Sequence, residues 1–240
     1  MSKKLTTPAS PTRLLVEKNA KDELVKGRIE DATLLYVNMQ EGELAFGSET
    51  DRQLSVQVAV TEDTAKNWKA TFPKNGYREV PNDMFEKTYK TDPPYPAEEK
   101  QHVLKLKSRA TFREDDPERD IKAGDVIPYE TKSRPKLYEV VDGKPQDITQ
   151  TTQPANGSRG VVAFRATSNK FGEFPVLSGV LVTELIEAEQ QANIASDFGI
   201  TDDMPSTQRV GLDAPGSSAG VSSESPQAEQ QSSNFDDDWI

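Results

Sequence analysis

The stretch LSVQVAV, residues 54–60, determines how we interpret the middle of the chain. Its aliphatic positions alternate with less apolar ones: Leu54, Val56, Val58 and Val60 are separated by Ser55, Gln57 and Ala59. A β-strand turns successive side chains to opposite faces of its sheet, so this alternation predicts a strand with one face in a core. The next residues, 61–72, place acids in a first turn and Ala65, Trp68 and Phe72 at helical spacing. They predict a helix inserted after the strand, with Thr61 as its N-cap.

Further along, several segments repeat the strand pattern. LYEVVDGKPQDI (137–148) contains Asp142-Gly143, a pair typical of two-residue β-hairpin turns. RGVVAFRATS (159–168) and PVLSGVLVTEL (175–185) are apolar segments with a turn expected between them at 168–170. Short strands with one inserted helix and long loops predict a mainly β fold, a small closed or half-closed barrel. A sandwich of two sheets is the alternative.

The composition excludes several classes of site. The chain has 240 residues, 34% of them hydrophobic, with no cysteine and one histidine, His102. Disulfides, zinc–thiolate sites, iron–sulfur clusters and cysteine nucleophiles are therefore excluded. No apolar run approaches the length of a membrane span, and the N-terminus lacks the apolar segment of a secretory signal. We therefore expect a cytoplasmic protein with no membrane partner and no cofactor.

Acidic residues are concentrated at the C-terminal end. The net charge is −11, and residues 187–240 contain eleven acidic residues against a single base, Arg209. Residues 1–186 are nearly neutral, with 28 basic and 29 acidic residues. Composition divides the chain into four expected parts. They are a flexible arm (1–20), a β-domain (21–186), a frayed helix with a low-complexity, disordered linker (187–234), and an acidic-hydrophobic tip (235–240).

The segment HVLKLKSRATFR (102–113) is the strongest candidate for a binding surface. As a single strand it would point Leu104 and Leu106 into the core. The opposite face would carry Lys105, Lys107, Arg109 and Arg113, with no acid among its outward positions. Cations two residues apart on one face are about 6.8 Å apart and repel each other unless an anion lies along them. A solvated amphipathic strand is the alternative, but such a face usually mixes both signs.

Two more segments extend this pattern. In TKSRPKLYEV (131–140), a strand would align Lys132, Arg134, Lys136 and Tyr138 on one face, with Pro135 favouring an edge or bent strand. The loop 74–96 interleaves basic residues with Tyr77, Phe85, Tyr89 and Tyr95. Cations that follow phosphates, and rings that stack on bases, are what a single-stranded nucleic acid groove needs. Pinning of the loop to the body is the alternative role for each ring.

Catalytic patterns are weak. His102 has no sequence signal of a triad, and the acidic run 113–120 lacks the spaced ligands and glycine of a calcium loop. No phosphate-binding glycine motif is present. We therefore expect no enzyme. A nuclease that uses acidic residues and a metal ion is the least favoured alternative, and a structural or assembly protein with a β-domain and a spacer tail is the main one.

The last six residues, FDDDWI (235–240), end a long polar linker with acids and two large apolar residues. Phe235, Trp239 and Ile240 suit a hydrophobic pocket on a partner, while Asp236, Asp237 and Asp238 suit its Lys or Arg residues. This tip resembles that of bacterial single-stranded DNA-binding proteins, an Asp-Phe-Asp-Asp-Asp run that closes on Ile-Pro-Phe. Here Asn234 replaces the leading Asp, and Trp239-Ile240 replaces the Pro-Phe ending.

The body is more similar to the replication single-stranded DNA-binding proteins of tailed bacteriophages. The similarity is carried by VKGRIEDATLLY (25–36) and GVVAFRATSNKFGEFPVLSGVLV (160–182). It implies an oligonucleotide-binding (OB) type of barrel with an acidic tail, and sequence-independent binding of single-stranded DNA in viral replication, recombination and repair. It also implies that the tip binds the replicative polymerase and the primase–helicase, in the cytoplasm of the host cell. Self-association into a homo-oligomer stays open.

Overall fold

The computed structural model describes residues 9–170 and 172–186, which lie within the first of two compact units of the chain, Met1–Ile194. This part is mainly β, as predicted: one sheet of nine strands with two α-helices and a short 3-10 helix, η1. The elements run in the order β1 (Arg13–Lys18), β2 (Leu24–Leu44), β3 (Arg52–Val60), α1 (Glu62–Thr71), β4 (Arg78–Pro81), α2 (Asn82–Tyr89), β5 (Lys100–Arg109), η1 (Pro117–Arg119), β6 (Lys136–Val141), β7 (Lys144–Asp147), β8 (Arg159–Asn169) and β9 (Gly172–Glu184).

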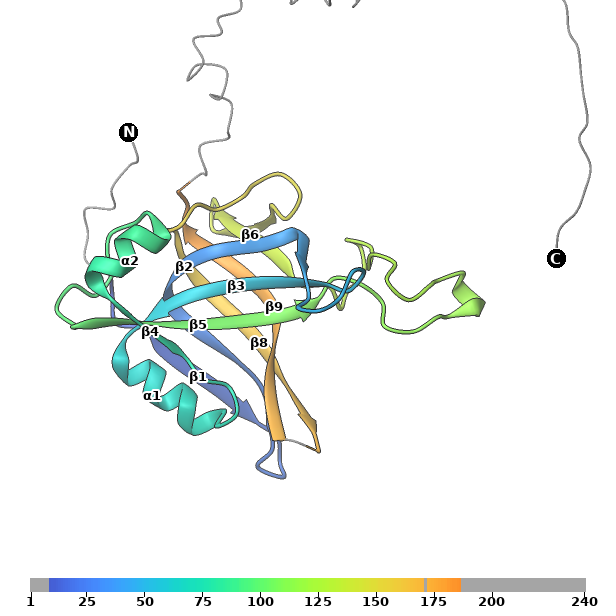
Figure 1. Cartoon of the computed structure of the whole chain (residues 1–240), viewed down its shortest axis with the longest axis horizontal. Coiled ribbons are helices and arrows are strands. Elements are labelled where there is room, and N and C mark those ends of the chain that lie inside the picture. Colours follow the sequence, from blue (N-terminus) through green and yellow to red (C-terminus); the bar gives the residue numbers. More distant parts are fainter. Residues whose placement is uncertain (1–8, 171, 187–240) are drawn as a thin grey trace, which may run out of the picture. The chain divides into compact units, whose positions relative to one another are not determined.

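The long strand β2 organises the sheet. The strands are ordered β4-β5-β3-β2-β8-β9-β6-β7, and β1 pairs with the first part of β2. All neighbours are antiparallel except β6 and β9, which run parallel. Because β2 bends, it pairs with β8 through its first half and with β3 through its second half. Strands β3 and β5 therefore cross in front of β8 and β9 (Figure 1).

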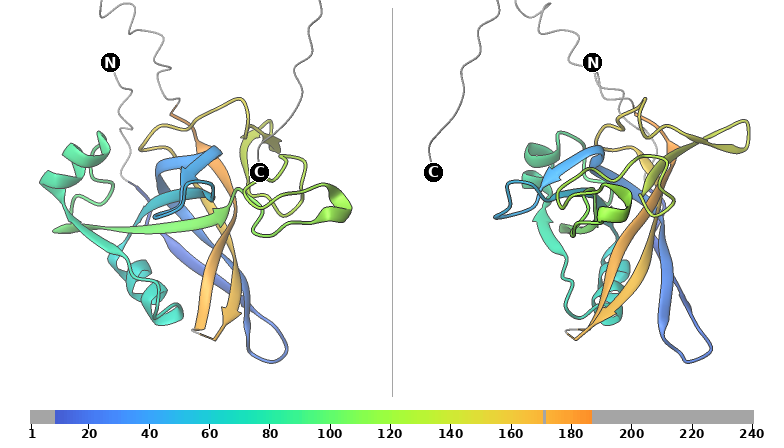
Figure 2. Two further views of the ribbon diagram at one scale, coloured as in Figure 1. Left: turned by 45° about the vertical axis from the view of Figure 1, so that its right-hand side comes forward. Right: turned by 90° about the vertical axis from the view of Figure 1, so that its right-hand side faces the viewer.

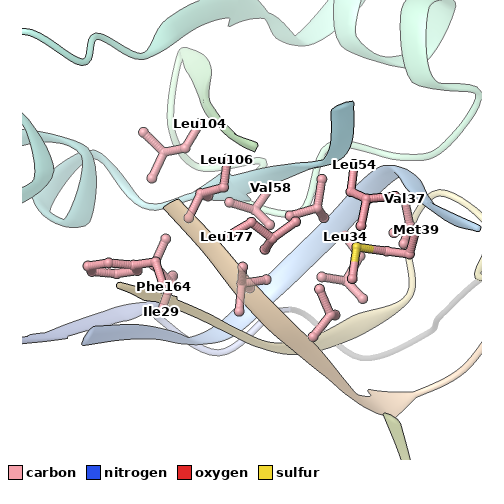
Figure 3. Packing of buried hydrophobic residues seen from close by; sticks show 14 of the residues in the cluster. Ile29, Leu34, Val37, Met39, Leu54, Val58, Leu104, Leu106, Phe164 and Leu177 are labelled. Carbon is pink, nitrogen blue, oxygen red and sulfur yellow. The ribbon is translucent and has the colours of Figure 1, made fainter. Parts of the chain in front are cut away.

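The sheet curls into a barrel around one apolar core. Strand β9 comes close to β5 without a hydrogen-bonded ladder between them, so the five strands β5-β3-β2-β8-β9 enclose a partly open barrel, as in an OB-fold. Inside it, one apolar cluster includes Leu34 of β2, Leu104 and Leu106 of β5, Phe164 of β8 and Leu177 of β9 (Figure 3). The single curled sheet excludes the two-sheet sandwich.

The two helices cover different parts of the barrel. Helix α1 closes one end, where Trp68 and Phe72 pack against Phe164 with ring centroids 5.4 and 5.6 Å apart. Thr61 occupies the N-cap position as predicted, but its hydroxyl contacts Thr12 and Thr64 instead of capping the helix. Helix α2 was not predicted. It covers the outer face of the sheet beside β4.

The remaining predicted elements are largely present. The strand at 54–60 lies within β3, Asp142-Gly143 joins β6 to β7, and β8 and β9 form the expected hairpin. The N-terminal prediction is wrong for residues 13–18, which form β1 rather than a flexible arm, with Leu14 packed against the core. In the described part of the chain, no helix is long and apolar enough to cross a membrane. The expected helix and linker at 187–234 and the tip at 235–240 lie outside the described residues.

Candidate nucleic-acid interface

Three predicted cations share the outer face of β5. Lys105, Lys107 and Arg109 are exposed, and they alternate with the buried Leu104 and Leu106 and with the half-buried Ser108. Their partners across the β3–β5 ladder are Gln57, Ser55 and Gln53, which are all uncharged. Directly opposed residues of an antiparallel pair point to the same face, so the cations form one row beside a polar, uncharged strip. We call Lys105, Lys107 and Arg109 the β5 row.

A fourth cation joins this face from the neighbouring strand. Arg78 of β4 is exposed and lies opposite Val103, which is two residues from Lys105 on the same side of β5. From the sequence, Arg78 is one of the basic residues interleaved with aromatic rings in the segment 74–96. Only its register with β5 shows that it extends the basic face.

One acid lies against the β5 row. The Glu43 carboxylate is 2.5 Å from the Lys105 ammonium, with both side chains more than a third exposed (36% for Lys105, 39% for Glu43). Partial burial alone would raise the pKa of Glu43. The hydrogen bond and charge of Lys105, the hydrogen bond of Ser55 and the charge of Lys107 together outweigh this effect, so the pKa of Glu43 is lowered below 4.5. Lys107 and Arg109 form no ion pair with any residue in the described part of the chain.

The other side of the barrel shows what a charge-balanced face looks like. On β1 and β2, Arg13 and Arg28 both contact Glu30, and Lys26 contacts Glu17 at 3.1 Å. Arg13, Arg28 and Lys26 are thus paired with acids on their own face. Lys107 and Arg109 of the β5 row form no such ion pairs with any described residue, so the outer face of β5 has a local excess of positive charge.

The row is shorter than the sequence predicts. Strand β5 ends at Arg109, and the next two residues, Ala110 and Thr111, are both buried, which breaks the expected alternation. The Thr111 hydroxyl accepts a hydrogen bond from the Arg52 N–H at 3.1 Å. Arg113 is exposed in the irregular segment 110–135, a lobe that projects from the sheet (Figure 2). It is therefore not aligned with the β5 row by strand geometry.

The second predicted row is not a strand face. Strand β6 begins only at Lys136, so Lys132 and Arg134 precede it in the lobe. Lys132 is exposed, Lys136 forms an ion pair with Asp147 at 3.1 Å, and Tyr138 is half-buried. The Lys136–Asp147 pair borders a hollow of about 300 Å³ that Tyr129 and Thr149 also line.

Arg134 has a structural environment. It is 3% exposed, its guanidinium donates to the backbone carbonyls of Ile127 and, at 2.6 Å, of Gln40, and it lies 4.2 Å from the Tyr129 ring centroid. Burial lowers its pKa, and Tyr129 partly offsets this effect. Because its donors are directed at the protein's own backbone, we leave Arg134 out of the interface.

The aromatic residues of 74–96 serve mainly as core. Phe85 and Tyr89 are fully buried where α2 packs against Val80 and Val103, and Tyr95 is 7% exposed. Tyr77 is partly buried against the barrel core and lies beside His102, at 5.4 Å between ring centroids. The pinning alternative therefore describes these rings better than stacking on bases. The interleaving of basic and aromatic residues fits a binding loop and a packed helix equally well, and this segment forms β4 and α2.

Two aromatic residues are exposed at positions where the sequence predicts no binding role. Tyr36 is 47% exposed at an irregular point of β2, and Phe46 is fully exposed in the turn between β2 and β3. Neither belongs to a basic run of sequence, so no local signal marked them. Among the described residues, no group of three or more His, Cys, Asp or Glu side chains is arranged to hold a metal ion.

Comparison with known proteins gives matches only among solved structures. No family model and no curated protein matches the sequence. A C-terminal truncation of the single-stranded DNA-binding protein of bacteriophage Enc34 is 13% identical, with a TM-score of 0.36 over 72% of this chain and 95% of that one. Its complex with single-stranded DNA is 12% identical, with a TM-score of 0.35 over 72% and 96%. The single-stranded DNA-binding protein gp2.5 of bacteriophage T7 is 12% identical, with a TM-score of 0.35 over 76% and 98%. These are proteins of the kind that the sequence resembles.

Proposed function

We propose that this chain binds single-stranded DNA without sequence preference and without catalysis. The observation that carries the proposal is the β5 row: Lys107 and Arg109 are exposed, aligned on one face and unpaired by any described acid. Cations at this spacing fit successive phosphates of an extended strand, and they contact a feature that every sequence shares. Lys105 and Arg78 extend the same surface.

A single strand suits this surface better than a duplex. Proteins that read duplex DNA commonly insert a helix into the major groove. In the described part of the chain, α1 and α2 both carry acids in their first turn, and their packed faces lie against the barrel. The cations lie instead on a strand face, which in OB-folds is a common site for oligonucleotides.

We further propose a role in phage DNA replication, recombination and repair. In this role the tip, Phe235 to Ile240, binds the replicative polymerase and the primase–helicase, and the chain protects single strands in the host cytoplasm. When DNA is absent, the acids of the tip partly occupy the β5 row, and DNA must therefore displace them in order to bind. The support is the sequence of the tip and the positive face that it complements.

Fluorescence anisotropy with labelled single-stranded and duplex oligonucleotides tests the proposal. We expect tight binding to the single strand, weak binding to the duplex, and a logarithm of affinity that falls linearly with the logarithm of salt concentration. A chain that ends at Asn234 should bind the single strand more tightly than the full chain. A flat salt dependence would rule out the phosphate contacts, and unchanged affinity of the shortened chain would rule out competition by the tip.

A further inference from the structure

Tyr36 has an unusual backbone for an aromatic residue. It lies in β2 where the pairing with β3 shifts register between Leu35 and Asn38, and its φ is +44°. Bulky side chains rarely adopt a positive φ, and such strain persists only where the surrounding structure enforces it. The side chain that is held this way is not buried, since 47% of Tyr36 is exposed.

Three contacts hold Tyr36 in place. Its N–H donates to Asn156 Oδ1 at 2.7 Å, and its hydroxyl donates to the Thr88 carbonyl at 2.6 Å. Its ring packs on Tyr89 with centroids 5.3 Å apart and an angle of 47° between the planes. Asn156 in turn donates to the Tyr89 carbonyl at 2.8 Å. The ring is therefore fixed at its hydroxyl end and against Tyr89, while nearly half of the residue faces solvent.

A short chain of contacts links this ring to the β5 row. The Tyr89 hydroxyl donates to Gln57 Oε1 at 3.1 Å, and Gln57 is the ladder partner of Lys105. Tyr36 thus lies at the α2 end of the row, separated from Lys105 by Tyr89 and Gln57. From Lys105 toward Val103, the outer face of β5 changes from exposed cations to the buried apolar cluster that α2 covers, which includes Phe85 and Tyr89.

We infer that Tyr36 is a platform on which one base of the bound strand stacks. The inference rests on the proposed function, because it needs a strand that follows the β5 row. A pre-positioned ring stacks on any base without reading its identity, and it loses little conformational entropy on binding. A platform explains why the fold maintains a positive φ at a tyrosine and leaves its ring at the surface beside the basic face.

The test compares Tyr36→Leu with Tyr36→Phe in the full chain. Both variants lose the hydroxyl bond to Thr88, but only Tyr36→Phe keeps an aromatic face. Tyr36→Leu also loses the ring contact with Tyr89, so it should lower the melting temperature more than Tyr36→Phe does. Each is titrated with a labelled oligothymidylate and with an abasic strand of the same length. We expect Tyr36→Leu to bind oligothymidylate at least about fivefold more weakly than wild type, the lower end of the contribution of one stacked base. Tyr36→Phe should stay within about twofold of wild type, and all three chains should bind the abasic strand equally.

Two results would overturn the inference. One is an equal loss by Tyr36→Leu on both strands, which would make the ring a support for the surface and not a contact to a base. The other is wild-type affinity of Tyr36→Leu for oligothymidylate. The abasic strand also separates this inference from the proposed function: wild type should still bind it through phosphates, with a clear salt dependence. Failure of wild type to bind either strand would remove the proposed function and the platform with it.

Discussion

Two lysine-rich segments of similar composition have different structures in this molecule. KLKSR (105–109) is the end of a regular strand, and its cations face solvent in one row. KSRPK (132–136) lies mostly before β6, where it separates into an exposed Lys132, a buried Arg134 and an ion-paired Lys136. The difference shows that neighbours across a ladder, more than the number of cations, determine whether a basic segment is available to a ligand.

Pro135 and the register of the sheet explain the different outcomes. Proline has no N–H to donate, so the strand does not extend back through the segment that contains it. Arg134 is then free to turn inward and bind the carbonyls of Ile127 and Gln40. In β5 no proline intervenes, and the aliphatic residues between the cations anchor the strand in the core. Three substitution experiments test this comparison.

The largest effect is expected from Arg134→Ala. The substitution removes a buried cation and takes away the partner of the Tyr129 ring. It leaves the Ile127 carbonyl without its side-chain donor, and the Gln40 carbonyl keeps only the Tyr129 hydroxyl among its described side-chain donors. We expect the free energy of unfolding to fall by about 2–4 kcal/mol, measured by urea denaturation. The matched control, Lys132→Ala, should change it by less than about 0.5 kcal/mol because its side chain is exposed. Equal, small effects of both substitutions would contradict a structural role for Arg134.

Charge removal in pairs gives the next effect. Lys107→Gln with Arg109→Gln should weaken binding to single-stranded DNA about tenfold or more. It should also reduce the steepness of the salt dependence by about 1.4, the contribution of two phosphates on a single strand. The control, Lys132→Gln with Lys136→Gln, removes the same charge from the other segment and should weaken binding less than about threefold. If the second pair proves as damaging as the first, the interface spans both segments and the contrast between them is lost.

The smallest effect concerns the acid beside the β5 row. Glu43→Gln releases Lys105 from its ion pair, and we expect DNA affinity to rise about two- to threefold at neutral pH. Stability should fall by less than about 1 kcal/mol, because the pair is largely exposed. Weaker DNA binding by this variant would mean that Glu43 positions Lys105 for DNA rather than competing with it.

The pH dependence provides an independent check on Glu43. Its pKa is lowered below 4.5 in the folded chain, so the ion pair contributes stability above that value and loses it as the pH falls through the lowered pKa. Wild type should therefore approach the affinity of Glu43→Gln only below pH 4.5. The ratio of their affinities, measured at pH 7 and at successively lower pH, should decrease toward one.

Local periodicity predicts what the strands alone determine. The alternation at 54–60 and at 104–109 specifies which side chains enter the barrel, because each strand has one face in the core. The hairpin turn at Asp142-Gly143 is equally local, since both residues adopt positive φ there. These features needed no knowledge of neighbouring segments.

Other features depend on neighbours distant in sequence. Phe85 and Tyr89 became core because α2 packs on the outer face of β3 and β5, a contact that the interleaved basic residues do not reveal. Tyr36 became prominent through a register shift in β2, and Arg78 through its place opposite Val103. For the same reason the sequence predicts the β5 row only in part. Alternation extended through Ala110 and Thr111 would place Arg113 in the row, but tertiary packing buries both of these residues and ends the alternation at Arg109.

The central position of β2 affects the way the chain must fold. Its second half can pair with β3 soon after synthesis, and one edge of its first half can pair with β1. The other edge of the first half must wait for β8, which follows most of the domain in the sequence. Until β8 emerges from the ribosome, an unpaired strand edge remains open to other nascent chains. Such long-range pairing slows folding, so we expect this domain to assemble late and in a single cooperative step, with co-translational aggregation as its main hazard.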